Sequence, residues 1–565
     1  MKDKLEFYHI VKEIDGREPS ELSRLMGDYD FNRYVVKMNL LGPVEEASVV
    51  PVVVRVSHAV AGFPEGLLSS PIRRTALEDL LTRKLAAAIQ AQATFNEKGV
   101  ARKRFYAPTP GQKILPRSTI LIDDDHTDVR LGLMLPLQRG RLDGEGLQQA
   151  FFDDLPLIVQ ESLLYCNMAS SEVDAFIALM EDADHIRQSL PARGFIGFVG
   201  TGSRLGRDEG SDRPDLASTR TIAVDPSLQV TMETPHAGAI QGLGLLSGIT
   251  LILGDVASGR VELMRALASG IYNHVPGDGR ETVIATPDTV YIAAEPGRCV
   301  QRVDLGGFLG QDDFSSRNAD ACQSQAASLV EALEAGARVL LFDEMDSCSG
   351  LLGRDDRVDA LLGESAGPAS LAARVKEMAQ ELGVSTVVAG HAAVAAFIPV
   401  ADTVLAIRDG VIKDITKEAK AKSGAIVSPA APAYDFTRLI ETARWVVPSS
   451  IDSSTGRHDG VIAADEQTGA IVFGRYLVPI RAAHQLAETQ QSLTIGLIME
   501  YMRQRYLDQA RPMRELLDLV ERDLSTEGLE HISRELRGDL VRPRRYEIAA
   551  ALNRLPSLRV ARAAL

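Results

Sequence analysis

One stretch, Ser247–Arg280, constrains this chain more than any other. It opens with an apolar run at Ile249–Leu253, turns through Gly254 and Gly259, and continues into a segment with helical spacing at Val261–Ala268. A strand, a glycine turn and a helix are the context in which the pattern G-x-x-x-x-G-K-[ST] holds phosphate. The glycines let backbone N–H groups turn inward, and the helix presents its positive end. The stretch therefore predicts a phosphate loop.

The residues of this loop keep the geometry of the pattern and change its chemistry. The sequence reads Gly254-Asp-Val-Ala-Ser258-Gly259-Arg260-Val261, so arginine stands where the pattern has lysine and valine replaces the magnesium-binding hydroxyl. An arginine fork is bulkier than a lysine and cannot sit between phosphate oxygens in the same way. We expect Gly254, Ser258, Gly259, Arg260 and Val261 to form the nucleotide-binding loop, with Mg²⁺ binding weakened by Val261.

Two later strands end in residues that suit nucleotide hydrolysis. The run Arg338–Phe342 ends in Asp343-Glu344, and Val384–Ala389 ends in Gly390-His391. Downstream of a phosphate loop, such an aspartate holds magnesium, and the glutamate orients and deprotonates the attacking water. We expect Asp343 to bind nucleotide and metal, and Glu344 and His391 to be catalytic. A surface histidine at the strand tip is the alternative for His391.

Length and composition indicate several domains. The 565 residues are too many for one core, so about three domains are expected. Residues 1–190 predict an α/β domain with strands at Tyr34–Leu41 and Val49–Val56, and residues 191–426 contain the phosphate loop. A Pro/Ala-rich linker at Val427–Ala433 separates them from an α+β domain at 434–565.

Charge is distributed unevenly along the chain. The net charge of −16 argues against a general polyanion binder, but one segment from Arg73 to Arg104 is locally basic. A solvated helix face and loop is one interpretation, and a groove for RNA or DNA phosphates is the other. The nucleic-acid candidates in this segment are Arg73, Arg74, Arg83, Lys84, Arg102, Lys103 and Arg104. A second loop, Thr201–Asp215, is either a surface excursion or faces phosphate through its arginines.

The four cysteines and the N-terminus indicate a cytoplasmic protein. Cys166, Cys299, Cys322 and Cys348 lie far apart in the sequence, which predicts reduced thiols. The first residues are charged and contain no secretory apolar region, and no apolar run approaches the length of about 18 residues of a membrane span. We expect a soluble protein without a membrane partner.

The order of these elements resembles the ATPase domains of the ABC class. The chain is similar in particular to the soluble family of predicted ATPases of the ABC class, whose relatives include a kinetoplastid mitochondrial RNA-binding ATPase associated with RNA editing. The resemblance spans nearly the whole chain. It rests on Ile14–Arg17, RRTALEDLLTR (Arg73–Arg83), Ser211–Pro214, YNHVPGDGR (Tyr272–Arg280), SQAASLVEALEAGA (Ser324–Ala337), GVSTVV (Gly383–Val388), Val400–Thr403 and RPRRYEIAAALNRL (Arg542–Leu555).

The resemblance implies a fold, ligands and partners. The fold is α/β, with an ABC-type P-loop ATPase domain flanked by an N-terminal α/β domain and a C-terminal α+β domain. The ligands are ATP or ADP with Mg²⁺, and the partners are RNA and a second chain in a head-to-tail dimer. In such a dimer the start of the helix before the acidic strand reaches the γ-phosphate held by the other chain, which makes Ser324 and Gln325 nucleotide-binding candidates.

The departures from the family pattern concern the residues that drive hydrolysis. Relatives carry G-K-S-T where this chain has Gly259-Arg260-Val261-Glu262, and a Ser-Gly pair where it has Asp320-Ala321. They also carry Asp-Thr-Ser where it has Met345-Asp346-Ser347, and a GKS-like segment where it has GVARKR at 99–104. Phosphoryl transfer depends on positioning and charge stabilisation, so we expect slow or absent hydrolysis.

Three functional hypotheses follow. The first is a degenerate family member that binds nucleotide weakly or structurally and acts through RNA or a protein partner. The second is an active ATP hydrolase with Glu344 as general base. The third is a structural partner of a consensus paralogue in a mixed dimer, although the damaged loop and helix start would leave each shared site defective.

Overall fold

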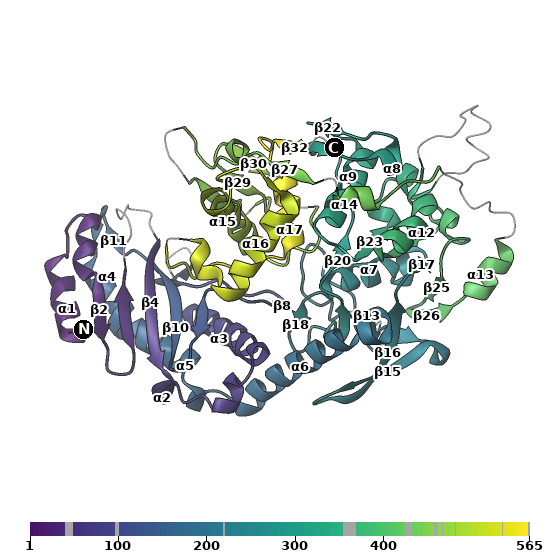
Figure 1. Ribbon diagram of the computed structural model, residues 1–565. Helices are drawn as coiled ribbons and strands as arrows, with labels where there is room; N and C mark the ends of the chain where they lie inside the picture. Colours follow the sequence, from purple (N-terminus) through teal and green to yellow (C-terminus); the bar gives the residue numbers. More distant parts are fainter. Residues whose placement is uncertain are drawn as a thin grey trace. The chain divides into compact units, whose positions relative to one another are not determined.

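The computed structural model describes residues 1–39, 49–95, 101–217, 221–353, 369–423, 432–441, 443–456, 460–465, 467–480, 482–533 and 535–562. Its contacts divide the chain into two compact units, which are shown in Figure 1. Unit 1 contains Met1–Glu181 and Glu527–Arg542, and unit 2 contains Asp182–Thr526 and Pro543–Leu565. The boundaries near 190 and 426–434 that the sequence suggests stay a prediction, and most of the Val427–Ala433 linker lies outside the described residues.

Unit 1 is built on a largely antiparallel sheet with the order β1-β2-β3-β4-β10-β7, in which β9 also pairs with β10. Its central ladder joins β4 to β10 from Val49 opposite Met134 to Ser57 opposite His126. One face of β10 is buried through Thr127, Val129, Leu131 and Leu133. The strands are β1 Lys2–Asp3, β2 Gly27–Asp30, β3 Val35–Met38, β4 Val49–Ser57, β7 Phe105–Tyr106, β9 Ile120–Ile122 and β10 His126–Met134.

Helices of unit 1 include one that begins earlier than the sequence suggested. Apolar spacing predicts a helix from Leu77, whereas α3 begins at Pro71 and ends at Ala91, so Arg73 and Arg74 lie in its first turn. Proline is pre-organised for a first helical position, and the Ser70 side chain caps the Arg73 N–H at 3.3 Å. The other helices are α1 Lys4–Glu13, α2 His58–Ala61, α4 Gly144–Gln148, α5 Leu155–Leu163 and α6 Ser170–Ser189, the last of which continues into unit 2.

Unit 2 is organised around a seven-stranded sheet with the order β14-β26-β25-β17-β24-β23-β20. The run from β25 to β20 is parallel, and the long apolar sequences of these strands fit a sheet that is covered on both faces. The predicted strand Ile249–Leu253 is β17, with the same bounds. The other strands are β14 Ala223–Val224, β20 Thr289–Tyr291, β23 Val339–Asp343, β24 Ser385–Gly390, β25 Thr403–Arg408 and β26 Val411–Asp414.

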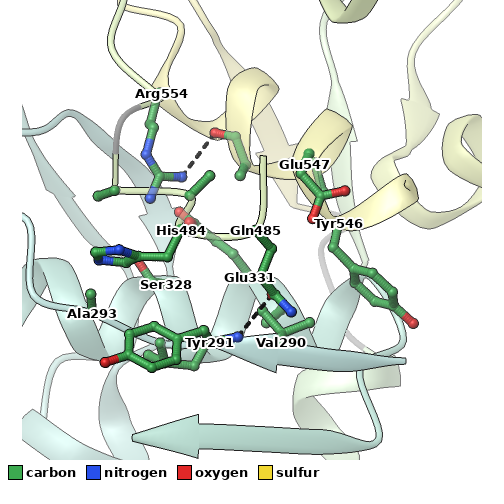
Figure 2. A pocket seen from close by; sticks show the side chains of 16 residues that line it. Val290, Tyr291, Ala293, Ser328, Glu331, His484, Gln485, Tyr546, Glu547 and Arg554 are labelled. Atoms are coloured by element: carbon green, nitrogen blue, oxygen red, sulfur yellow. Dashed lines mark hydrogen bonds between the residues drawn. The ribbon is translucent and has the colours of Figure 1, made fainter. Parts of the chain in front are cut away.

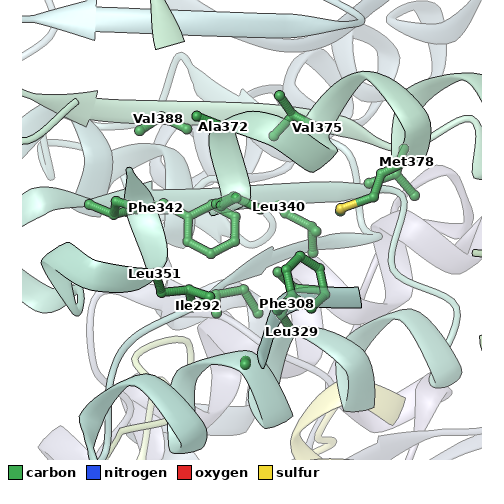
Figure 3. Packing of buried hydrophobic residues seen from close by; sticks show 14 of the residues in the cluster. Ile292, Phe308, Leu329, Leu340, Phe342, Leu351, Ala372, Val375, Met378 and Val388 are labelled. Atoms are coloured by element: carbon green, nitrogen blue, oxygen red, sulfur yellow. The ribbon is translucent and has the colours of Figure 1, made fainter. Parts of the chain in front are cut away.

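Two helical layers cover the faces of this sheet. On one face, Leu340 and Phe342 of β23 pack with Leu329 of α9 (Ala321–Glu334) and Val375 of α12 (Leu371–Leu382), as Figure 3 shows. On the other face, β17 and β23 pack against α7 (Arg260–Ser269). Because all three helices are amphipathic, the parallel strands stay buried between them.

The rest of unit 2 completes the fold around the central sheet. A second, four-stranded sheet has the order β15-β16-β13-β19. Strands β25 and β26 form a hairpin, in which Asp409 and Gly410 both adopt positive φ at the two-residue turn. Its further elements are β13 Phe195–Gly200, β15 Gln229–Thr234, β16 Gly238–Leu246, β19 Val283–Ala285, β21 Val300–Val303, β22 Phe314–Ser316, β27 Arg444–Val446, β28 Ile462–Ala464, β29 Ile471–Phe473, β30 Tyr476–Val478, β31 Arg511–Pro512, β32 Val560–Arg562, α8 Gly306–Leu309, α10 Ser349–Leu352, α13 Thr416–Lys422, α14 Thr437–Glu441, α15 Thr489–Arg505, α16 Met513–Thr526 and α17 Arg545–Arg554.

The expectation of four reduced cysteines is wrong for one pair. Cys322 and Cys348 form a disulfide, with their Cα atoms 5.2 Å apart and a sequence separation of 26. The start of α9 lies beside the segment that follows β23, so residues distant in sequence meet. Cys166 and Cys299 remain free.

This pairing predicts a thiol count. Protein alkylated at lysis and purified without reductant should show two reactive thiols after unfolding, and four after reduction. A Cys322→Ser variant should show three before reduction, because Cys348 loses its partner. Four thiols in the wild-type protein before reduction would contradict the disulfide.

The YNHVPGDGR motif forms a buried ionic cluster. Oδ2 of Asp278 accepts a hydrogen bond from Nη2 of Arg207 at 2.6 Å and from the Arg280 N–H at 3.3 Å, and it lies 2.7 Å from Nδ1 of His274. Burial alone raises the pKa of Asp278, but these cationic partners outweigh it and hold its pKa below the ordinary value. Arg207 belongs to the predicted loop Thr201–Asp215, so the cluster fixes that loop to the motif.

This shift predicts a pH-dependent cost for removing the charge of Asp278. A depressed pKa means that the carboxylate stabilises the folded state above the ordinary aspartate pKa of about 3.9, and that this stability is lost as pH falls through the folded-state value. Asp278→Asn should therefore destabilise unit 2 at neutral pH, and its difference from wild type should shrink below about pH 4. Urea unfolding followed by fluorescence of the single Trp445 measures this, and the exposed Asp208→Asn is the control. A difference that does not change with pH would contradict the ionic role.

Candidate functional site

The candidate site lies at the carboxyl ends of three adjacent strands. β24 lies between β17 and β23, and all three are parallel. The loop after β17 begins at Gly254, β23 ends at Asp343, and β24 ends at Gly390. Ligands of open parallel sheets bind at this edge. The structure thus brings together the phosphate loop, the acidic pair and the histidine loop that the sequence predicted.

The phosphate loop is tightly held by its neighbours. Val256–Ser258 form a short 3₁₀ turn, and Gly259 adopts a left-handed conformation with φ of 98° before α7 begins. The Ser258 hydroxyl donates to the Asp255 carbonyl at 2.7 Å, so it is turned into the loop. A Cβ at Gly254 would come within 2.5 Å of that hydroxyl oxygen and 2.6 Å of Cγ2 of Ile407. Gly259 is therefore required by its backbone conformation, and Gly254 by the side chains packed against it.

A buried ion pair joins the phosphate loop to the acidic strand. Nη1 of Arg260 donates to Oδ2 of Asp343 at 2.7 Å, and both residues are 1% exposed. The second carboxylate oxygen of Asp343 accepts the Met345 N–H at 2.9 Å. Arginine does not deprotonate in proteins, so its charge is always present beside Asp343. The group expected to hold Mg²⁺ is thus neutralised by the side chain that replaced the loop lysine.

The predicted catalytic residues meet through a backbone contact. Glu344 accepts hydrogen bonds from the N–H groups of His391 and Ala393, the latter at 3.3 Å. A Cβ at Gly390 would lie 2.6 Å from Oε2 of Glu344 and 2.6 Å from Cγ1 of Val394, so a larger residue there would displace these side chains. The His391 side chain is exposed. The carboxylate oxygens of Glu344 therefore hold the loop after β24. A general base would need these same oxygens to bind the attacking water.

Ser324 and Gln325 are buried and connect α9 to the chain around it. The Ser324 hydroxyl accepts the Glu295 N–H at 3.0 Å and donates to the Ala321 carbonyl at 2.9 Å. Nε2 of Gln325 donates to the Ser347 hydroxyl at 2.8 Å, and its Oε1 accepts the Cys348 N–H at 2.8 Å. Both residues are 0% exposed. Their polar side-chain groups are used inside unit 2, and a nucleotide contact for them stays a prediction.

Asp320 is the N-cap of α9. From the family resemblance, the start of this helix is expected to approach a nucleotide bound by a second chain. The Asp320 carboxylate accepts the Gln323 N–H at 2.8 Å, and the Gln323 side chain accepts the Asp320 N–H at 3.1 Å. This reciprocal capping box stabilises the first turn of α9. Asp320 is exposed, so its negative charge stays at the helix start.

Sequence reasoning missed two acidic residues at this site. Asp255 lies exposed within the phosphate loop, where it adds negative charge at the point of phosphate approach. Asp346 accepts a hydrogen bond from the Tyr291 hydroxyl at 2.7 Å, and its carbonyl accepts the Ala294 N–H at 2.8 Å. A carboxylate inside a phosphate loop was a visible signal for Asp255. No local pattern marks Asp346, because its partners lie about 50 residues away in sequence.

A small cavity lies beside Tyr291 (Figure 2). It has a volume of about 50 Å³ and is lined by β20, α9, α17 and the 482–485 segment. The Tyr291 N–H donates to Oε1 of Gln485 at 3.0 Å, and the ring of His484 stands edge-on to that of Tyr291. The cavity is too small for a nucleotide.

The predicted nucleic-acid residues are mostly paired with carboxylates of unit 1. The ion pairs are Arg73 with Glu181, Arg74 with Asp124, Arg83 with Asp79, Lys84 with Glu172, and Arg104 with Asp154. Lys103 is exposed, and the side chain of Arg102 lies outside the described residues. In the described part of the segment, the positive charge is thus largely balanced within the fold.

The residues present do not fit a bound Mg²⁺ ion. Val261 has no hydroxyl, Asp343 is committed to Arg260, and the described residues contain no group of three or more His, Cys, Asp or Glu side chains placed to hold a metal. Magnesium in phosphate sites needs hard oxygen ligands with free lone pairs. What the loop keeps is a glycine turn and a helix start, which suit an anion.

Comparison with protein families covers nearly the whole chain. Residues 5–166 match the model "ATPase of the ABC class N-terminal", residues 169–434 match the ABC_ATPase "P-loop domain", and residues 463–561 match the "MRB1590 C-terminal domain".

The chain belongs to the ABC-class ATPase family.

Similar solved structures are ATP-binding cassettes. One is CbiO1 of Clostridium perfringens, part of the ABC transporter complex CbiONQ, with 14% identity, 41% of this chain and 93% of that chain covered, and a TM-score of 0.25. Another is the ADP conformation of MJ1267, with 13% identity, 35% and 94% coverage, and a TM-score of 0.23. A search of curated proteins found no match. No helix among the described residues of this family member is long and apolar enough to cross a membrane.

The buried pair predicts a large stability cost when one partner is removed. Arg260→Met leaves Asp343 buried without its counter-charge and should destabilise unit 2 by about 3–5 kcal/mol. The double variant Arg260→Met with Asp343→Leu should recover much of this loss, because no unpaired charge remains. Urea unfolding monitored through Trp445 compares the three proteins. Additive losses in the double variant would contradict the pairing.

Proposed function

We propose that this family member is a nucleotide-binding protein with weak or no ATP hydrolysis, which acts by binding RNA or a protein partner. The observation that carries the proposal is the buried Arg260–Asp343 pair. ATP or ADP would bind at the glycine turn and the start of α7. The negative charge of Asp343, the expected magnesium ligand, is neutralised by Arg260.

The charges around the loop support weak rather than tight nucleotide binding. Glu262 lies in the first turn of α7, where a carboxylate interacts favourably with the helix dipole and so competes with phosphate for it. Asp255 adds a second negative charge in the loop. Against these, Arg260 supplies one cation, which Asp343 already engages.

Hydrolysis lacks support at both halves of a shared site. In a head-to-tail dimer, Asp320 would bring a carboxylate to the γ-phosphate held by the other chain, which is unfavourable electrostatically. In a homodimer, each shared site would combine the altered phosphate loop of one chain with the altered α9 start of the other. In a mixed dimer with a paralogue, each shared site would contain one of these two altered elements. RNA as the macromolecular partner is supported by the family resemblance.

ATP turnover and binding test the proposal. We expect full-length protein to turn over ATP at the rate of its Glu344→Gln variant, and its nucleotide affinity to gain nothing from Mg²⁺ in isothermal titration calorimetry. The triple variant Arg260→Lys, Val261→Ser, Asp320→Ser restores the family residues and should bind nucleotide more tightly with Mg²⁺ than without it. Wild-type turnover that depends on Mg²⁺ and is abolished by Glu344→Gln would instead establish the active hydrolase.

A further inference from the structure

The disulfide of unit 2 joins the start of α9 to the segment that follows the acidic end of β23. Cys322 lies in the first turn of α9, just after the N-cap Asp320. Cys348 lies shortly after Glu344, beyond the short turn that follows β23. Both elements carry residues that the family resemblance associates with nucleotide. A covalent bond between them is therefore placed where it can affect the candidate site.

Hydrogen bonds connect the same two elements independently of the disulfide. Gln325 lies one helical turn after Cys322 on the same face of α9. Its side chain donates to the Ser347 hydroxyl at 2.8 Å and accepts the Cys348 N–H at 2.8 Å. Gln325 is 0% exposed, so water does not compete for these bonds. We therefore expect the region to stay folded when the two sulfur atoms separate.

The disulfide is accessible to a thiol from solvent. Both cysteines are partly exposed, unlike the buried Gln325 beside them. Gly350 is exposed and lies against the bond, since a Cβ there would come within 3.5 Å of Sγ of Cys322 and 3.9 Å of Sγ of Cys348. Glycine has no side chain that would cover the sulfur atoms. Exposed disulfides are typically the labile ones that exchange with thiols.

Opening the disulfide would loosen the segment that begins with the acidic pair. At the start of this segment, Asp343 is bound to Arg260, and Glu344 holds the loop after β24. At its other end, the disulfide fixes Cys348 to α9. Without the bond, a ligand at the site must order the segment itself, and this ordering costs conformational entropy. A nucleotide should therefore bind more tightly when the disulfide is closed.

We propose that Cys322 and Cys348 form a reversible thiol–disulfide switch, which strengthens nucleotide binding when closed and weakens it when reduced. The inference rests on the proposed function in taking a nucleotide as the ligand, and it goes beyond that function by assigning a regulator to the site. The reductant is a small thiol of the glutathione type.

The exchange proceeds in two balanced steps. The thiolate of one reductant molecule attacks a cysteine sulfur, which breaks the Sγ–Sγ bond, forms a mixed disulfide and releases the other cysteine as a thiolate that takes up a proton. A second reductant thiolate attacks the reductant sulfur of the mixed disulfide and releases the first cysteine, which is also protonated. Two electrons thus pass to the cysteine pair, and two reductant thiols leave as one disulfide. Oxidised glutathione closes the pair by the same steps in reverse.

Isothermal titration calorimetry with ADP tests the switch in the full-length protein. A Cys166→Ser, Cys299→Ser background removes the free thiols and leaves Cys322 and Cys348 as its cysteines. We expect the oxidised form to bind ADP between about 5-fold and 150-fold more tightly than the phosphine-reduced form, which is the usual range of coupling between two sites. Circular dichroism checks that both forms are folded.

The matched control removes the switch and keeps the fold. Adding Cys322→Ser and Cys348→Ser to the same background gives a protein that cannot form the bond. This variant should bind ADP with the affinity of the reduced form, and phosphine should not change that affinity. A response of this variant to phosphine would assign the effect to the reductant and would overturn the switch.

The coupling can also be measured from the side of the disulfide. Native protein of the same background is equilibrated with mixtures of reduced and oxidised glutathione, and its thiols are alkylated and counted by mass spectrometry. Linkage is reciprocal, so saturating ADP should make the pair harder to reduce by the factor by which reduction weakens ADP binding. For this two-electron couple, the expected factor corresponds to a midpoint lowered by about 20–65 mV.

The outcomes separate the switch from the function on which it rests. If both forms bind ADP equally, or if the reduced form binds it more tightly, the switch is overturned while nucleotide binding stands. A pair that stays oxidised in native protein at the most reducing glutathione mixture would also overturn it, because the disulfide would then be purely structural. If neither form binds ADP, the nucleotide part of the proposed function fails and the switch fails with it.

Discussion

The Arg260–Asp343 ion pair is the interaction on which the character of this P-loop domain depends. It joins the first residue of α7 to the last residue of β23 in the interior, across 83 residues of sequence. Removing two charges from water is costly, and their mutual attraction with additional hydrogen bonds must offset that cost. The Met345 N–H supplies one such bond to Asp343. The pair thus converts two positions associated with phosphate and metal into a structural contact between a helix and the sheet.

Local patterns predicted much of the frame around this pair. The strand Ile249–Leu253, the glycine turn and the acidic end of β23 all follow from short-range order, because apolar runs and turn residues fix them locally. The partners of charged side chains do not follow in this way. Arg260 is read from sequence as a phosphate ligand, and only the fold reveals Asp343 beside it. The basic run behaves similarly, since the carboxylate that pairs with Arg73 comes from a helix 108 residues away.

The segment after β23 is bound to α9 by both polar and covalent links. The Gln325 side chain is hydrogen-bonded to the Ser347 hydroxyl and to the Cys348 N–H. The disulfide joins Cys348 to Cys322, which lies about one helical turn before Gln325 in α9. Asp346 is in turn held by Tyr291 of β20. The start of α9, the end of β23 and the end of β20 are therefore expected to respond together to any change at the site. Cysteines 26 residues apart gave no hint of this in the sequence, because their proximity depends on the helix returning alongside the strand.

The capping box of α9 has a consequence for how this lineage can change. Serine is as good a helix cap as aspartate, and Gln323 would complete a capping box with either, so Asp320→Ser is a step that costs the fold little. Returning position 260 to lysine is more demanding, because lysine keeps a positive charge beside the buried Asp343 but does not reproduce the hydrogen-bonding geometry of the arginine guanidinium. The departures at positions 320 and 260 therefore differ in how much structural stability their reversal would cost. The substitution at position 320 is easily reversed, whereas the one at position 260 is held in place by its buried partner Asp343.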